Sequence, residues 1–254
     1  MCCFTGPVTS VSATKIFARM GDRSRQYLVY SMNVDAPKEL AMVLPIPVAA
    51  GSDEKAVRFI NLEKYPTFFE DMEAGFPVPP PRSKGQGITV LAAGRDSAPL
   101  PVFQVGSFEA SFVPTVADFD RLDERFRLPA GTFDKLTGYK QFGFAVFKLK
   151  PGAQKIHPMA FEFPTALMSH LFFPTVHIHD GKVHTRAGFD HVLYCQSAAN
   201  LRVKVLDWRE SDRLAEKFVD TKKAEGIVLA KEHCFRRELR GSLPNEDTIL
   251  SAAN

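Results

Sequence analysis

Hydrophobic residues dominate three early segments of the chain, and polar turn residues separate them. Positions 11–19, 26–34 and 40–48 are rich in Val, Ile, Tyr, Phe and Met, with Gly21-Asp22 and Asp35-Ala36-Pro37 between them. Such runs, bounded by Gly, Asp and Pro, predict strands joined by turns. We therefore expect an antiparallel meander in the first quarter of the chain. Pro45 and Pro47 cannot donate to a ladder, so the third strand should end at an edge or leave the sheet there.

The rest of the chain alternates between strand and helix patterns. Helices are expected at about 66–73, at 116–126 behind Thr115 as N-cap, and at 211–222. Short strands are expected at 56–60, 142–149, 159–163, 175–179, 183–185, 191–196 and 201–206. This mixture predicts an α+β fold that is β-rich, with mainly antiparallel sheets or a sandwich and a few peripheral helices.

A proline-rich segment divides the chain unequally. Positions 77–87 contain Pro79-Pro80-Pro81 and two glycines, a composition that favours an extended linker or a surface loop. Neither flank has the pattern of a self-sufficient unit. We therefore expect one globular domain over residues 1–254, with a subdomain break at 77–87 as the alternative.

The amino-acid composition and the net charge of the chain exclude some classes of binding partner. The 254 residues are 45% hydrophobic and 24% charged, with a net charge of +3 and no basic tract, which is typical of a folded protein that does not bind nucleic acid. No window approaches the roughly 20 apolar residues of a membrane helix, and the first residues lack the pattern of a signal peptide. We expect a cytoplasmic protein without a nucleic-acid or membrane partner, and a small-molecule or peptide substrate if it is an enzyme.

Positions 177–184 carry the most informative pattern of side chains. Asp180-Gly181 stands between alternating residues, which predicts a two-residue hairpin turn. Counting outward from the turn places His177, His179 and His184 on one face of the hairpin. Facing Cβ atoms lie roughly 4.5 to 5.5 Å apart, close enough for imidazole nitrogens to reach one metal ion.

Further metal ligands are available on either side of this hairpin. His191 and Cys195 would share one face of the next strand, and the thiols of Cys2 and Cys3 would join if the meander packs beside the hairpin. Imidazole and thiolate ligands suit zinc or copper equally. The leading hypothesis is a metal-binding protein, or a zinc- or copper-dependent enzyme if one coordination position stays open. The alternative for the same histidines is a solvated hairpin face.

Cys2 offers a second kind of chemistry. Removal of the initiator Met would make Cys2 the N-terminal residue, and its α-amino group, with a reference pKa of about 7.7 to 8.0, would serve as the base. Positions 15–22, Lys-Ile-Phe-Ala-Arg-Met-Gly-Asp, resemble the strand and turn of choloylglycine hydrolases and penicillin V acylases. This resemblance implies an amidohydrolase with Cys2 as nucleophile and with Arg19 and Asp22 as binding or polarising groups. The sequence shows no counterpart of the later Asn and Arg residues of that family.

A broader resemblance rests on three pieces of sequence. They are Cys2-Cys3-Phe4, positions 41–48 with Leu-Pro-Ile-Pro-Val, and Gly138-Tyr139 followed by the strand at 144–150. Together they resemble an uncharacterised bacterial family, often secreted, which implies a shared fold without a defined activity. The chain departs from that family in its lack of a signal peptide and in its histidine hairpin. A third hypothesis is a non-catalytic binding or interaction domain with solvated histidines and packed cysteines.

Overall fold

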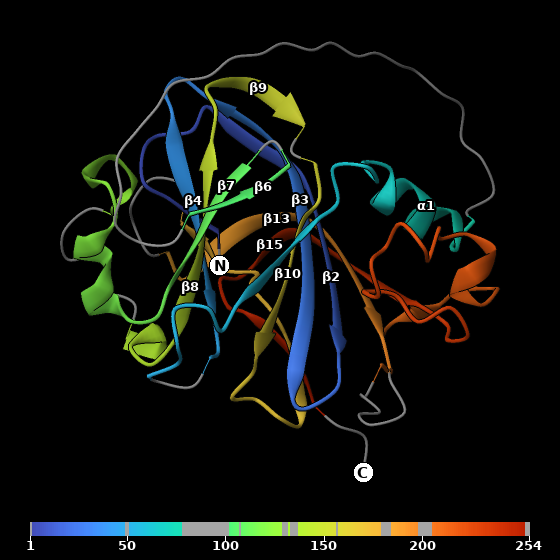
Figure 1. Cartoon of the computed structure of the whole chain (residues 1–254). Coiled ribbons are helices and arrows are strands. Elements are labelled where there is room, and N and C mark those ends of the chain that lie inside the picture. Colours follow the sequence, from blue (N-terminus) through green and yellow to red (C-terminus); the bar gives the residue numbers. More distant parts are fainter. Residues whose placement is uncertain are drawn as a thin grey trace.

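Two β-sheets form the body of the protein (Figure 1). The computed structural model describes residues 2–48, 51–77, 102–106, 108–128, 132, 137–155, 157–178, 184–197 and 205–251. The six-stranded sheet has the order β12 (His177–Ile178), β1 (Cys2–Phe4), β4 (Leu40–Ile46), β8 (Gly143–Leu149), β7 (Phe108–Val113) and β6 (Phe103–Val105). The eight-stranded sheet has the order β14 (Arg209–Glu210), β15 (Phe235–Pro244), β13 (Arg186–Gln196), β2 (Ser10–Met20), β3 (Arg25–Ala36), β10 (Met159–Pro164) and β5 (Arg58–Asn61), and β9 (Gly152–Lys155) also pairs with β3. A separate pair joins β11 (His170–Phe173) to β16 (Thr248–Ser251).

The β-rich prediction is confirmed, and both large sheets are mixed in direction. β2 pairs antiparallel with β3 as expected, but it pairs parallel with β13, and β1 pairs parallel with β12. The predicted meander ends after β3, because β4 crosses to the other sheet and pairs with β1 and β8. β4 ends at Ile46, between the two prolines of this segment. Pro45 is still inside the strand, opposite Phe144.

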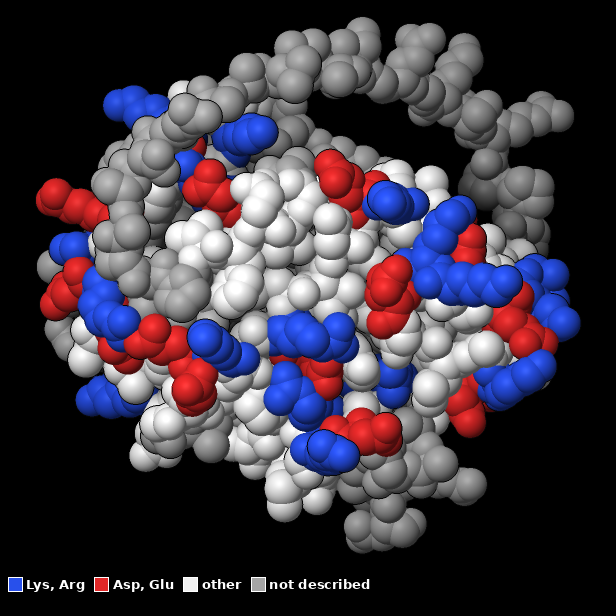
Figure 2. Space-filling model, viewed as in Figure 1, with Lys and Arg blue, Asp and Glu red and all other residues white. Residues whose placement is uncertain are grey.

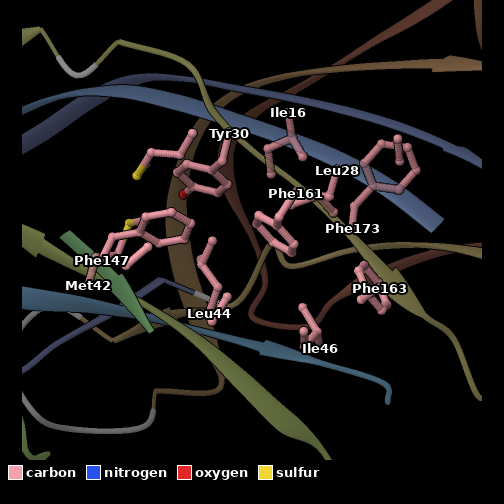
Figure 3. Packing of buried hydrophobic residues seen from close by; sticks show 14 of the residues in the cluster. Ile16, Leu28, Tyr30, Met42, Leu44, Ile46, Phe147, Phe161, Phe163 and Phe173 are labelled. Atoms are coloured by element: carbon pink, nitrogen blue, oxygen red, sulfur yellow. The ribbon is translucent and has the colours of Figure 1, made fainter. Parts of the chain in front are cut away.

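The main hydrophobic core lies between the two large sheets (Figure 3). Leu28 and Tyr30 of β3 and Phe161 of β10 meet Met42 of β4 and Phe147 of β8 there. The intervening residues of the same strands are buried on the opposite faces, as Val29 and Val43 show. Burial on both faces explains why these strands read as nearly continuous hydrophobic runs.

Short elements cover the outer faces of both sheets. Helix α1 (Phe68–Ala74) packs Phe68, Phe69 and Met72 onto the outer face of the eight-stranded sheet. On the outer face of the six-stranded sheet, Phe119 and Leu122 pack with Cys3 and Phe144. The molecule therefore has three hydrophobic clusters, one between the sheets and one on each outer face.

Two of the predicted helices are wrong. Residues 116–126 form two 3₁₀ segments, Val116–Arg121 and Glu124–Phe126, and Thr115 bonds the carboxylate of Asp118 without capping a backbone group. Residues 211–222 contain only the 3₁₀ turn Ala215–Lys217, because the amides of Ala215 and Glu216 donate to the carbonyls of Glu232 and Ala230. These long-range bonds replace the bonds to residue i−4 that an α-helix requires. A further 3₁₀ turn is Thr137–Tyr139.

The proline-rich segment beyond Pro77 lies outside the described residues. The structure nevertheless joins the parts before and after it, because β4 and β8 form seven cross-strand pairs. On the face shown in Figure 2, positive and negative side chains are interspersed around a stretch of uncharged residues. The described helices include none with the length and apolar character to cross a membrane.

Candidate functional site

Among the described residues, two of the predicted histidines pack together with a phenylalanine, with their rings tilted or edge-on to one another. The ring of His177, on β12, lies 4.5 Å from the ring of His191 and 4.6 Å from that of Phe189, both on β13. β12 belongs to the six-stranded sheet and β13 to the eight-stranded sheet. This aromatic cluster of His177, Phe189 and His191 is thus a packing contact that joins the two sheets.

His191 is almost completely buried, and its environment suits the neutral ring. Burial lowers the pKa of His191 below its usual value, while the neighbouring carboxylate of Asp190 opposes that shift. Nδ1 of His191 lies 3.5 Å from Oδ1 of Asp190, which is long for a hydrogen bond. The other oxygen of Asp190 accepts the backbone N–H of Ala13, where β2 bulges. Asp190 therefore holds the backbone of β2 as well as facing the imidazole.

Of the remaining hairpin histidines, His184 is exposed. His179 and the predicted turn at 180–183 lie outside the described residues. A residue that the sequence did not single out holds the two ends of the segment. The side-chain amide of Asn245 donates to the carbonyl oxygens of His177 and His184, and its oxygen accepts the N–H of His177. Asn245 directly follows Pro244. This dipeptide, which is typical of turns, was the only feature of the sequence that could have drawn attention to Asn245.

The described cysteines are buried in three different hydrophobic clusters. Cys3 packs in the outer cluster of the six-stranded sheet, Cys195 between the sheets, and Cys234 in the outer cluster of the eight-stranded sheet. Burial raises the pKa of the Cys195 thiol well above its usual value and that of Cys234 to about 12. These thiols stay protonated at neutral pH, so they are weak nucleophiles and weak metal ligands.

The prediction of a zinc or copper site is therefore wrong for the part of the chain that the structure describes. No group of three or more His, Cys, Asp or Glu side chains there is arranged to hold a metal ion. His191 and Cys195 do share a face of β13, but they are four positions apart along the strand, a distance of roughly 13 Å. Two residues on one face of a strand can bind the same ion only when they are near neighbours. The expectation that His191 and Cys195 share an ion took account of the face of the strand but not of this distance.

The groups assigned to a Cys2 nucleophile lie at different places. The backbone of Cys2 pairs with His177, which contacts His191. Arg19 pairs with Gln196 at the other end of β13, roughly 16 Å along the strand from His191. The Arg19 guanidinium is buried and donates to the carbonyls of Met20, Gly226 and Ile227, while Asp22 is exposed in the following turn. The structure thus uses Arg19 to anchor a loop and does not bring it to Cys2.

The surface that the sequence did not reveal is strand β15. Its ten residues pair along their whole length with β13, yet none of its side chains is buried. On its other edge, the described residues pair only through Arg209 and Glu210 of β14, opposite Arg236 and Phe235. From residue 237 onward, no described strand pairs with the outer edge of β15.

Comparisons with known proteins give distant structural similarities only. No protein-family model matches the chain, and no curated protein gives a significant match. Baculovirus P35 is 14% identical, with a TM-score of 0.49 and coverage of 100% of both chains. A mutated P35 after caspase cleavage is 14% identical, with a TM-score of 0.47 over 95% of this chain and 99% of that one. P35 in a complex with caspase-8 is 12% identical, with a TM-score of 0.46 over 95% and 96%. Similarity at this level carries no argument about function.

Proposed function

We propose that this protein is a non-catalytic protein-binding domain that takes up an extended segment of a partner along β15. The observation that carries the proposal is that, among the described residues, no strand pairs with the outer edge of β15 beyond Arg236, and that each side chain of β15 is at least partly exposed. An open sheet edge is a template for one more strand, because main-chain hydrogen bonds supply affinity without a preformed pocket.

The direction of the backbone groups in β15 follows from the bonds at its two ends. The N–H of Asn245 donates to Thr185, on the β13 side, whereas the N–H and the carbonyl of Cys234 bond Ser211 on the opposite side. N–H and C=O groups of successive strand residues point to alternate edges. Glu238, Arg240 and Ser242 therefore direct their N–H groups away from β13. Pro244, which has no N–H, is the last residue of this outward series.

Four reactive side chains among the described residues have structural roles, which favours binding over catalysis at these positions. The Cys195 and Cys234 thiols are buried with raised pKa values, and Arg19 is bonded to three backbone carbonyls. His191 is stacked between the sheets. The metal-dependent chemistry predicted from the hairpin finds no ligand group in the described residues.

Selection from a random peptide library, with the full-length protein as bait, tests this proposal. We expect selected peptides to bind the wild type and the Glu238→Ala variant, which keeps the N–H of residue 238. Both variants lose the Glu238 carboxylate, but Glu238→Pro also lacks the outward N–H, so compared with Glu238→Ala it should lose most of the binding while its ladder with β13 remains. Peptides that bind the proline variant as well as the wild type would show that β15 is not the binding edge.

Purified caspase-8 is a defined protein probe for the same binding assay, because it forms a solved complex with P35. Binding that Glu238→Pro removes would identify caspase-8 as a partner at β15. Binding that persists in Glu238→Pro would place the caspase contact elsewhere on the molecule and would count against β15 as the principal edge.

A further inference from the structure

The side chains of β15 form two different rows, one on each side of the open edge. Arg236, Glu238 and Arg240 alternate along one face, and both arginines bond the carboxylate of Glu238. The opposite face carries Arg237 together with Leu239 and Leu243, which are all partly exposed, and Leu239 also packs with part of its side chain against the core between the sheets. The rows contain three arginines and one glutamate, so the edge has an excess of positive charge.

Space is available on both faces beside the outer part of the strand. A Cβ atom added at Gly241 of β15, or at Gly188 opposite Ser242, would meet no atom within 4 Å. Gly241 also has a φ of +81°, a conformation that suits glycine and interrupts the regular strand. Side chains of an added strand would therefore meet the arginine row on one face and the Leu239 and Leu243 row on the other.

We propose that the segment taken up by β15 is acidic and extended, with apolar residues at alternate positions. This inference rests on the proposed function and names the partner class for the same edge. Acidic side chains on the face of Arg236, Glu238 and Arg240 would neutralise the excess positive charge there, since opposite charges on neighbouring strands attract. Arg237 on the other face adds to the positive charge of the edge. Apolar side chains at every second position would cover Leu239 and Leu243.

A second copy of this chain is a less favourable occupant of the same edge than an acidic segment, because both copies carry the same excess of positive charge. In an antiparallel pair of two β15 strands centred on Arg240, the two Arg240 side chains would also lie opposite one another. Like charges directly across a strand pair are unfavourable. Because Pro244 ends the outward series of N–H groups, this edge of β15 also favours a short segment over a long continuous ladder.

Three labelled peptides of about eight residues, a usual strand length, provide the test by fluorescence anisotropy. Valine alternates with Glu in the first, with Gln in the second and with Lys in the third. We expect the Val–Glu peptide to bind at least about tenfold more tightly than the Val–Gln peptide, with the Val–Lys peptide weakest. Its affinity should fall with added salt, because exposed charges are screened.

Two double variants separate local charge from net charge. Arg237→Glu/Arg240→Glu should reverse the order, so that the Val–Lys peptide binds best. Lys38→Glu/Lys64→Glu makes the same change of net charge on exposed residues outside β15 and its neighbours, and it should keep the preference for Val–Glu. Circular dichroism of both variants checks that the fold is retained.

The possible failures of the two proposals differ. In one outcome, the Val–Glu and Val–Gln peptides bind the wild type with equal affinity and both lose binding to Glu238→Pro. That result would overturn the proposal of an acidic partner but would leave the proposal of strand addition intact. Val–Glu binding that Glu238→Pro does not weaken would place the site away from β15 and overturn both. An absence of binding by all three peptides would overturn the present inference, while library peptides that need the N–H of residue 238 would still uphold the proposed function.

Discussion

His191 shows how its neighbours determine what a reactive side chain does. In the sequence it is one of several closely spaced histidines, and it was predicted to be a metal ligand. In the structure its ring packs against His177 and Phe189, and the Asp190 carboxylate lies on one side. Two of the histidines that lie close together in the sequence therefore pack between the two sheets. A local sequence pattern cannot distinguish such a packing contact from a set of metal ligands.

The lowered pKa of His191 predicts a loss of stability in acid. The unfolded chain has a usual histidine pKa of about 6.5, so below that pH it binds a proton before the folded protein does. The free energy of unfolding should therefore fall as the pH drops through this range. His157, whose pKa burial also lowers, adds to the same trend. Urea denaturation at about pH 7.5 and 5.5 measures the change.

His191→Phe provides the comparison for this pH dependence. The variant keeps an aromatic ring beside His177 but cannot take up a proton, so it should lose less stability on acidification than the wild type. Part of the dependence should remain because His157 is unchanged. An equal loss in the wild type and the variant would show that His191 does not cause the effect.

The bulge in β2 gives a prediction at the scale of the element. Ala13 has a φ of +53°, and the pairing of β2 with β3 shifts between Ser12 and Lys15. A left-handed backbone costs a residue with a Cβ roughly 1–2 kcal/mol, and glycine avoids this cost. Ala13→Gly should therefore stabilise the protein by about 0.5 kcal/mol after the larger entropy of the unfolded glycine is subtracted.

Ala18→Gly, in the regular part of the same strand, is the matched control. Ala18 is fully buried and pairs with Leu28. We expect the control to destabilise the protein by about 1 kcal/mol or more, because it adds backbone freedom and removes a buried methyl group. Denaturant midpoints measure both changes. Destabilisation by Ala13→Gly as large as that of the control would contradict strain at the bulge.

The elements differ in how far the sequence reveals them. β3, β8 and β10 were predicted near their observed bounds because their hydrophobic runs are buried on both faces. β15 was missed because its apolar residues, Phe235, Leu239 and Leu243, recur every four positions without the alternation of a strand. Pairing with β13, far away in the sequence, determines the conformation of β15. The open edge was therefore not predictable from local pattern.

The two large sheets depend on one shared core, which predicts cooperative unfolding of the whole molecule. Phe147 of the six-stranded sheet has its ring 5.7 Å from Phe59 and 5.9 Å from Phe161 of the other sheet. Phe147→Ala should lower the free energy of unfolding by about 3–5 kcal/mol. Met168→Ala, at an exposed residue, should change it by about 0.5 kcal/mol or less.

Trp208, the single tryptophan, makes this cooperativity measurable. It packs 5.6 Å from Phe173 beside the shared core. Trp208 fluorescence and far-ultraviolet circular dichroism should therefore follow the same denaturation curve in the wild type. Separate curves would show that the sheets unfold independently, as two subdomains would.

The position of Pro244 bears on how the protein behaves at high concentration. An open strand edge is a recognised starting point for fibre growth, in which identical chains add without limit. Here the outward series of N–H groups ends at Pro244, Gly241 departs from the regular strand, and arginines flank both faces. If the proposed function holds, the same features that suit this edge to a short foreign segment also disfavour the addition of further copies of its own chain.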